Sequence, residues 1–237
     1  MYLSDFNKII DSNFIFEKQI RADDKKEILL FCHKLTKQYI IKKTFSGSAE
    51  VYEMLIHISH KNLPKVYDIQ YGNGYVTIYE EYIDGITVAD VIKDGLYNEN
   101  GVKMIILSLC NVLEVLHNMN IIHRDIKPEN IVIDKSGTVK LIDFDSSRIY
   151  KPFSGGDTKM LGTPGYAAPE QFGIKQSDFR TDIYALGILI NVMLTGTHPA
   201  DFLYRGKYKK IIEKCTMTNP EHRFQSIKQL HKKIEKM

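Results

Sequence analysis

The sequence has few cysteines, and they form no pattern. Cys32, Cys110 and Cys215 are far apart in the 237 residues, and their number is odd. A disulfide framework needs paired cysteines, and a zinc site needs closely spaced Cys or His. None of the eight histidines stands in such a spacing either. The sequence therefore favours neither a disulfide-rich secreted protein nor a zinc protein, and it predicts a reducing, cytoplasmic environment.

Long apolar runs are also scarce. The N-terminal residues Met1–Asp5 lack the basic region and apolar run of a signal peptide. The most apolar stretches, Met104–Leu116 and Ile183–Leu194, are too short or too polar to cross a bilayer. No G-x-S-x-G motif or Cys–His arrangement suggests a hydrolase. We expect a protein without a membrane-spanning segment.

A strong excess of charge is missing from the chain as a whole, whose formal net charge is +3. The segment Arg205–Met237 differs, since it has ten Lys or Arg against three Asp or Glu. A basic surface can bind nucleic acid. No recognition motif accompanies these charges, so we expect a solvated face on the last helices and regard nucleic acid as an unlikely partner. Nothing in the sequence points to a particular oligomeric state.

One stretch of the chain predicts a metal site. The apolar run Ile131–Ile133 and the β-prone run Thr138–Ile142 flank the turn formers Asp134–Gly137. This pattern predicts a β-hairpin, whose outer ends lie together. Asn130 precedes the first strand and Asp143 follows the second. An amide oxygen and a carboxylate brought together suit Mg²⁺, which completes its shell with phosphate oxygens and water.

The loop before this hairpin adds a carboxylate and an ammonium. Asp125 lies five residues before Asn130, with Lys127 between them. A carboxylate, a cation and a metal site in one loop fit phosphoryl transfer, because positioning and charge neutralisation supply most of its catalysis. Asp125, Lys127 and Asn130 are therefore the candidate catalytic residues, and Asn130 and Asp143 are the candidate metal ligands.

These residues carry a family resemblance. The segment His123–Asn130 resembles the catalytic loop of eukaryotic-type protein kinases, and Lys127 two residues after the aspartate is typical of the serine/threonine branch. Asp143–Asp145 stands where that family has Asp-Phe-Gly, and Gly162–Glu170 is similar to the segment that closes the activation loop. The resemblance implies a two-lobed α+β fold.

That fold would have a β-rich N-lobe over residues 1–82 and a mainly helical C-lobe over residues 83–237. The local patterns agree, because β-branched and aromatic runs dominate the first part and a helical apolar stripe covers Val102–Leu116. The strands are expected at Phe14–Phe16, Glu27–Cys32, Tyr39–Lys43 and Tyr75–Tyr79, with one helix at Ser48–Ile58.

The resemblance also implies nucleotide-binding residues in the N-lobe. Lys42, with Lys43 as the alternative, stands where the family has the lysine that binds the ATP α- and β-phosphates. Its expected glutamate partner is Glu50, with Glu53 as the other candidate. In the hinge-like segment Tyr79–Gly85, backbone groups would hydrogen-bond adenine; these groups belong to Glu81 and Ile83. Glu80 occupies the usually apolar gating position, so its carboxylate must find a partner, raise its pKa or turn outward.

The family's glycine-rich phosphate loop is missing. It would fall at Arg21–Lys26, which contains no glycine. Glycine there lets backbone N–H groups approach phosphates, whereas Asp23 and Asp24 would repel them. We therefore expect ATP to bind more weakly or in a different way. Asp145, in place of the family's glycine, is a second departure.

In the C-lobe the resemblance implies three supporting contacts. Asp182 would hold the backbone of the catalytic loop, Arg223 would pair with Glu170, and Thr163 would contact both Asp125 and Lys127.

The implied function is an ATP- and Mg²⁺-dependent serine/threonine protein kinase with protein substrates. Arg124 suggests a site for phosphate on the activation loop, with Thr158 as the favoured autophosphorylated residue. The alternative is a pseudokinase, an ATP-binding or scaffolding module, which the missing glycines favour. A small-molecule phosphotransferase would not need Gly162–Glu170.

Overall fold

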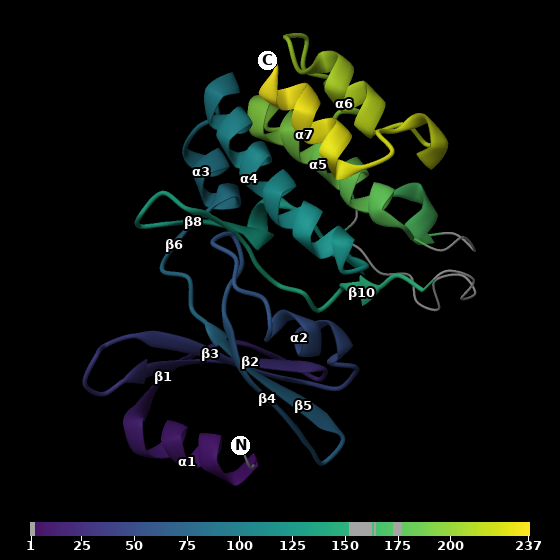
Figure 1. Ribbon diagram of the computed structural model, residues 1–237. Coiled ribbons are helices and arrows are strands. Elements are labelled where there is room, and N and C mark those ends of the chain that lie inside the picture. Colours follow the sequence, from purple (N-terminus) through teal and green to yellow (C-terminus); the bar gives the residue numbers. More distant parts are fainter. Residues whose placement is uncertain (1–2, 152–162, 164, 173–176) are drawn as a thin grey trace. The chain divides into compact units, whose positions relative to one another are not determined.

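The computed structural model describes residues 3–151, 163, 165–172 and 177–237, and it divides the chain into two compact units. Unit 1 is Met1–Asp84 and unit 2 is Gly85–Met237. The division falls two residues beyond the expected boundary between residues 82 and 83. Unit 1 is built around a β-sheet and unit 2 mainly from helices, so the predicted α+β class is confirmed (Figure 1).

Unit 1 contains an antiparallel sheet of five strands in the order β1-β2-β3-β5-β4. Its elements are α1 (Leu3–Asn13), β1 (Phe14–Asp23), β2 (Lys26–His33), β3 (Tyr39–Phe45), α2 (Glu50–Leu55), β4 (Val66–Gly72) and β5 (Tyr75–Glu81). All four predicted strands are present. Because side chains alternate along a strand, the sheet has two different faces.

One face of this sheet packs against α1 and the other against α2 (Figure 1). The α1 face holds a cluster of Ile10, Ile40 and Tyr79, extended by the partly buried rings of three phenylalanines, Phe6, Phe14 and Phe31. The Tyr79 hydroxyl donates a hydrogen bond to Asn7 Oδ1 at 2.9 Å. Tyr52 of α2 is buried on the opposite face, so each face has its own apolar core.

Helix α1 was missing from the expected elements, because the first 80 residues were interpreted as strands with a single helix. Its signal is the apolar spacing of Leu3, Phe6 and Ile10, which is helical but short. Strand β4 was not among the expected strands, although apolar and polar residues alternate over Tyr67–Tyr71, which is a strand pattern.

Unit 2 is organised around α4 (Glu99–Asn118), whose apolar stripe is buried against α5 and α7 (Figure 1). By length and composition alone α4 could span a membrane. The burial of its stripe inside the unit accounts for that apolar composition. The other helices of unit 2 are α3 (Val88–Asp94), α5 (Phe179–Thr195), α6 (Lys209–Cys215) and α7 (Ile227–Glu235), with short 3₁₀ turns η1 (Pro128–Asn130), η2 (Pro169–Phe172) and η3 (Pro220–His222).

The predicted hairpin is confirmed as β8 (Ile131–Asp134) and β9 (Val139–Leu141). Its turn is closed by Asp134 Oδ1, which accepts the backbone N–H groups of Ser136 and Thr138 at 2.8 and 2.9 Å. A third strand, β6 (Gly85–Thr87), pairs with β8. A Cβ at Gly85 would lie 2.2 Å from the carbonyl oxygen of Ile133, so only glycine allows this pairing. Two further strands, β7 (Ile121–Ile122) and β10 (Arg148–Ile149), pair with each other.

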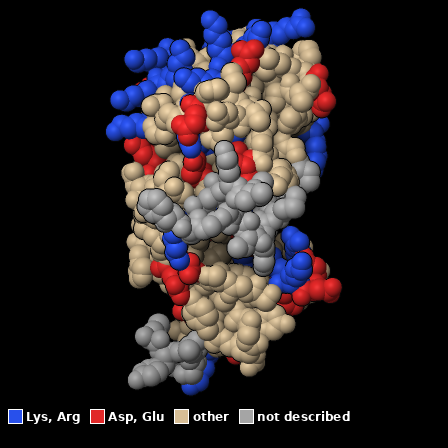
Figure 2. Space-filling model, turned by 90° about the vertical axis from the view of Figure 1, so that its right-hand side faces the viewer, with Lys and Arg blue, Asp and Glu red and all other residues tan. Residues whose placement is uncertain are grey.

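Basic side chains gather on the surface over α6 and α7 (Figure 2). Nine of the ten Lys and Arg of residues 205–237 are exposed, as a solvated face requires. The tenth, Arg223, is buried and has a structural role instead.

Arg223 uses all five of its N–H groups. It binds the Glu170 carboxylate in a bidentate pair at 2.6 and 2.8 Å, which confirms the predicted contact. Its remaining hydrogen bonds go to three backbone carbonyls, those of Met217, Arg180 and Thr218. A buried guanidinium is tolerated when every donor has an acceptor. This residue therefore ties η2, α5 and the segment before α7 together.

Replacing Arg223 should strongly destabilise the protein. We expect Arg223→Ala to lower the free energy of unfolding by about 3–5 kcal/mol, because it leaves a buried carboxylate without its cation. Urea denaturation measures the change. Lys209→Ala is the control, since Lys209 is exposed and 3.8 Å from Glu213, and such pairs contribute about 0–1 kcal/mol. Equal losses in the two variants would contradict a structural role for Arg223.

Candidate functional site

The two ends of the β8–β9 hairpin meet as predicted. Ile131 pairs with Leu141, and the N–H of Ile142 donates to the carbonyl of Asn130 at 2.9 Å. The backbone of Asn130 therefore lies beside that of Ile142, and Asp143 follows directly. Asp143 has a φ of 66°, a left-handed conformation that is uncommon for a residue other than glycine and is often found at functional sites.

Asp125 is the centre of a hydrogen-bonded cluster. Its carboxylate is 2.8 Å from Lys127 Nζ and accepts the Thr163 hydroxyl at 2.7 Å. Lys127 Nζ also donates to Thr163 Oγ1 at 2.7 Å, so the predicted contact of Thr163 with both residues is confirmed. Asn130 Nδ2 donates to the Asp125 carbonyl and to its carboxylate, at 2.8 and 3.0 Å. The three predicted catalytic residues thus lie together, with Asp125 only 9% exposed.

These hydrogen bonds orient the Asn130 amide. Because its Nδ2 serves Asp125, its Oδ1 is the atom left to act as a metal ligand. That oxygen and the Asp143 carboxylate form a hard donor pair that fits Mg²⁺, an ion that needs few protein ligands when phosphate is bound. The described part of the chain contains no group of three or more His, Cys, Asp or Glu side chains that would hold a metal without such help.

Asp182 of α5 binds the backbone of the catalytic loop. Its carboxylate accepts the backbone N–H groups of His123 and Arg124 at 3.0 and 2.8 Å, as predicted, and His117 Nε2 lies 2.8 Å away. Burial opposes ionisation of Asp182, but these hydrogen bonds and the nearby imidazoles lower its pKa overall. The carboxylate therefore stays ionised and fixes Arg124 in a left-handed conformation, with φ of 69°.

Arg124 is buried near a second arginine. Burial, followed by the positive charge of Arg148, lowers the pKa of Arg124 to about 10. Two neighbouring guanidinium groups favour an anion. The predicted phosphate acceptor Thr158 lies outside the described residues.

The structure places the two adjacent lysines of β3 on opposite faces of the sheet. Lys43 is buried on the α2 face, 5.9 Å from the Tyr52 ring centre, whereas Lys42 lies on the α1 face, 6.0 Å from the Tyr79 ring centre. Because successive side chains point to opposite faces, only one of them can share a face with α2. We therefore replace Lys42 with the alternative, Lys43, as the candidate phosphate-binding lysine.

Glu80 forms an ion pair with Lys43. Its carboxylate is 2.6 Å from Lys43 Nζ, and both side chains are more than 90% buried. Glu50 is exposed at the first residue of α2, and a contact of this residue with the phosphate-binding lysine stays a prediction, now directed at Lys43. The other candidate, Glu53, accepts a hydrogen bond from the Tyr71 hydroxyl.

The hinge-like segment Tyr79–Gly85 includes Glu80 and continues beyond the end of β5. The N–H of Glu81 donates to the Lys65 carbonyl at 2.8 Å, and an adenine contact through the backbone of Glu81 stays a prediction. Ile83 follows the end of β5 in a half-buried segment without regular structure, and its adenine contact stays a prediction.

The β1–β2 turn replaces the glycine-rich loop with a closed structure. Asp23 Oδ1 accepts the backbone N–H groups of Lys25 and Lys26 at 3.0 and 3.1 Å. These hydrogen bonds, foremost that from Lys25, and the Arg21 side chain lower the pKa of Asp23. The backbone N–H groups of this turn thus bind the Asp23 carboxylate. The absence of glycine from the sequence does not by itself predict these hydrogen bonds.

The Lys43–Glu80 pair predicts a double-mutant result. Removing one partner leaves a buried charge, so Lys43→Met or Glu80→Met alone should lower the free energy of unfolding by about 3 kcal/mol. The double variant should recover most of this loss, because apolar side chains of similar volume tolerate burial. Lys42→Met is the matched control and should change stability by less than about 1 kcal/mol. A double variant as unstable as the two single losses combined would exclude such coupling.

Comparison with known proteins agrees with this geometry. The family described as "Protein kinase domain" matches residues 18–237. A probable serine/threonine-protein kinase CPE1738 of Clostridium perfringens is 31% identical over 180 residues, covering 71% of this chain and 26% of the relative. The probable serine/threonine-protein kinase PknB of Lactococcus lactis is 33% identical over 150 residues, covering 62% of this chain and 24% of the relative.

An Aurora kinase of Eremothecium gossypii is 29% identical over 214 residues, covering 90% of this chain and 54% of the relative. The chain thus spans about a quarter of the length of the two bacterial relatives and about half of the fungal one. Helix α1 precedes the region that the family match covers. The match over residues 18–237, together with the catalytic loop and hairpin, shows that this chain belongs to the eukaryotic-type serine/threonine protein kinase superfamily.

Proposed function

We propose that this chain is a serine/threonine protein kinase that transfers the γ-phosphoryl group of ATP to protein hydroxyls. The observation that carries the proposal is the hydrogen-bonded cluster of Asp125, Lys127, Asn130 and Thr163 beside Asp143. All of the groups that would touch reacting atoms are present in it. The three cysteines are free and buried, which agrees with a proposed cytoplasmic location.

In the proposed reaction, Asp125 orients the acceptor hydroxyl and takes its proton as the new oxygen–phosphorus bond forms and the bond to the ADP oxygen breaks. Lys127 donates hydrogen bonds to the transferring group and offsets its charge. Asn130 Oδ1 and the Asp143 carboxylate would hold Mg²⁺, which supplies further neutralisation of phosphate charge when it is bound. Lys43 is the proposed ligand of the α- and β-phosphates.

Thr163 supports an aliphatic hydroxyl as the acceptor. Its Oγ1 donates to Asp125 and accepts from Lys127, both at 2.7 Å. A serine or threonine hydroxyl of a substrate needs the same two partners, a proton acceptor and a cation. We infer that Thr163 shapes this position for such acceptors and helps to exclude larger ones.

The closed β1–β2 turn supports weaker contacts to the phosphates than a glycine-rich loop makes. Its N–H groups at Lys25 and Lys26 already serve Asp23. Phosphate binding through this turn would have to break those bonds or rely on lysine side chains as point charges. We therefore propose a low affinity for ATP.

The same turn is the observation that favours a second function, a pseudokinase that acts as a scaffold. Asp145, which replaces the family's glycine, also favours the scaffold function. The complete Asp125 cluster favours the enzyme, because a scaffold has no need for these hydrogen bonds at the position of transfer.

Incubation with radiolabelled ATP and Mg²⁺ tests the proposal. We expect incorporation of phosphate into the chain itself and into a generic protein acceptor, and its loss on chelation of Mg²⁺. Asp125→Asn and Asp143→Asn should each reduce the rate by about a hundredfold or more. Asp94→Asn, an exposed carboxylate at the end of α3, is the matched control and should retain the parent rate. Absence of transfer in the parent, with folded protein, would favour the scaffold.

The two lysines of β3 offer a second test in the same assay. Lys43→Met should raise the KM for ATP and lower the rate, because it removes the buried cation on the α2 face. Lys42→Met should leave both values near those of the parent, since Lys42 lies on the α1 face. The opposite outcome would restore Lys42 to the role that the sequence suggested.

Substitution of Thr163 tests the hydroxyl. Thr163→Val keeps the size of the side chain and removes both hydrogen bonds, so the rate should fall by about tenfold or more, while Thr163→Ser should retain most of it. Peptides that differ only in Ser, Thr or Tyr at the acceptor measure the selectivity. Efficient transfer to tyrosine by the parent would contradict the serine/threonine assignment.

A further inference from the structure

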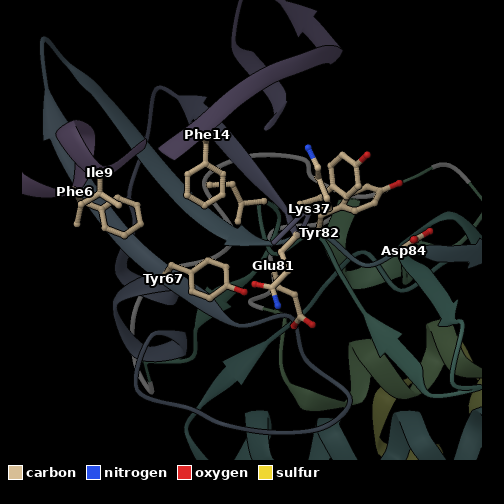
Figure 3. Close-up of a pocket in the computed structure, with 11 residues that line it drawn as sticks. Phe6, Ile9, Phe14, Lys37, Tyr67, Glu81, Tyr82 and Asp84 are labelled. Carbon is tan, nitrogen blue, oxygen red and sulfur yellow. The ribbon is translucent and has the colours of Figure 1, made fainter. Parts of the chain in front are cut away.

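Unit 1 contains a cavity on the α1 face of its sheet, away from Lys43 and Glu80. Its volume is about 520 Å³, within the range of about 300–1,000 Å³ that is usual for small-molecule sites. The walls come from α1, from the first residue of β1, from the β2–β3 connection with the start of β3, from Tyr67 of β4, and from the end of β5 with the residues that follow it. Figure 3 shows the lining side chains.

The position of this cavity separates it from the family's common machinery. Two of its lining residues, Phe6 and Ile9, belong to α1, and Phe14 begins β1. All three precede residue 18, where the family match begins. The cavity therefore depends on a segment that the protein kinase domain does not include.

The cavity is lined mainly by aromatic rings. Besides the two phenylalanines, it has three tyrosines, of which Tyr39 and Tyr82 pack edge to face with ring centres 5.7 Å apart. The third, Tyr67, already has the ammonium of Lys65 at 5.5 Å from its ring centre. The faces of such rings attract cations, and cages of several rings bind organic ammonium groups.

The charged side chains in the lining also favour a cation. Among the lining residues Glu81 and Asp84 contribute two carboxylates and Lys37 one ammonium, and the ammonium of Lys65 lies beside the lining at Tyr67. Glu81 lies close enough to Tyr67 that its charge, after burial, raises the pKa of that phenol. The lining residues themselves, with two carboxylates and one ammonium, carry a net negative charge.

The apolar side chains and the charged side chains lie at different ends of the cavity. Figure 3 shows Phe6 and Ile9 at one end and Lys37, Tyr82 and Asp84 at the other, with Phe14, Tyr67 and Glu81 between them. A ligand that matches both ends has an apolar chain or ring directed toward α1 and a positively charged nitrogen directed toward Tyr82 and Asp84.

We propose that this cavity is a binding site for a small organic cation with an apolar body, such as an alkylammonium or arylalkylamine compound. The site is separate from the ATP site of the proposed function. The two meet through one strand, because Glu81 lines the cavity while its neighbour Glu80 binds Lys43 on the opposite face of the sheet.

Titration of the ¹³C-tyrosine-labelled protein, without nucleotide, tests the site by NMR. The probes are hexyltrimethylammonium, hexanoate and hexanol, which share a six-carbon chain and differ in charge. We expect saturable shifts of the Tyr67 and Tyr82 ring signals with the cation, and an affinity about tenfold or more above that for hexanoate. Equal affinity for the three probes, or shifts only at tyrosines outside the cavity, would overturn the proposal.

Three substitutions locate the binding. Asp84→Asn and Tyr67→Ala should each weaken the cation by about threefold to tenfold, and Lys37→Ala should strengthen it, because it removes the like charge. Tyr75→Ala, an exposed tyrosine at the start of β5 outside the lining, is the matched control and should leave the affinity unchanged. If Lys37→Ala weakens the cation or Asp84→Asn has no effect, the lining charges do not select the ligand and the assignment is wrong.

This measurement does not depend on catalysis. A protein without phosphoryl transfer that still binds the cation would disprove the kinase proposal alone. A protein that transfers phosphate but fails to bind any of the three probes would disprove the cation site alone.

Discussion

The arrangement of unit 2 depends on one buried carboxylate, that of Asp182. It reaches from α5 to two consecutive backbone N–H groups of the catalytic loop and to His117 at the end of α4. A buried ion is costly unless several donors surround it, and here they come from the end of α4 and from the catalytic loop. The loop is therefore held in its left-handed bend at Arg124, and Asp125 is presented at the start of the cluster with Lys127 and Thr163.

In unit 1 the corresponding constraint is the alternation of side chains along β3 and β5. It sends Lys43 and Glu80 to one face of the sheet and Lys42, Tyr79 and Glu81 to the other. Neighbouring residues therefore serve two different sites. A shift of register by one residue would exchange the two sets, so the pairing of these strands is as important for function as any single side chain.

Much of this protein was readable from its sequence, and the reasons are local. The hairpin, the long helix α4 and the meeting of Asn130 with Asp143 follow from periodicity and turn residues within about twenty positions. The choice between Lys42 and Lys43 did not follow, because it depends on where α1 and α2 pack, which the strand sequence does not state. The partnership of Glu80 with Lys43 and the capping of the β1–β2 turn by Asp23 needed three-dimensional contacts as well. Helix α1 was missed because four apolar residues over eight positions are a short signal.

Helix α1 has a practical consequence for work on this chain. A recombinant version trimmed to the limits of the family match would begin at Lys18, and would lose α1 together with the first four residues of β1. The apolar cluster of Ile40, Tyr79 and Phe31 would then face water along a shortened edge strand, a surface that promotes self-association. Inclusion bodies or an inert product from such a trimmed version would report the loss of this cover, and would carry no information about the chemistry of Asp125.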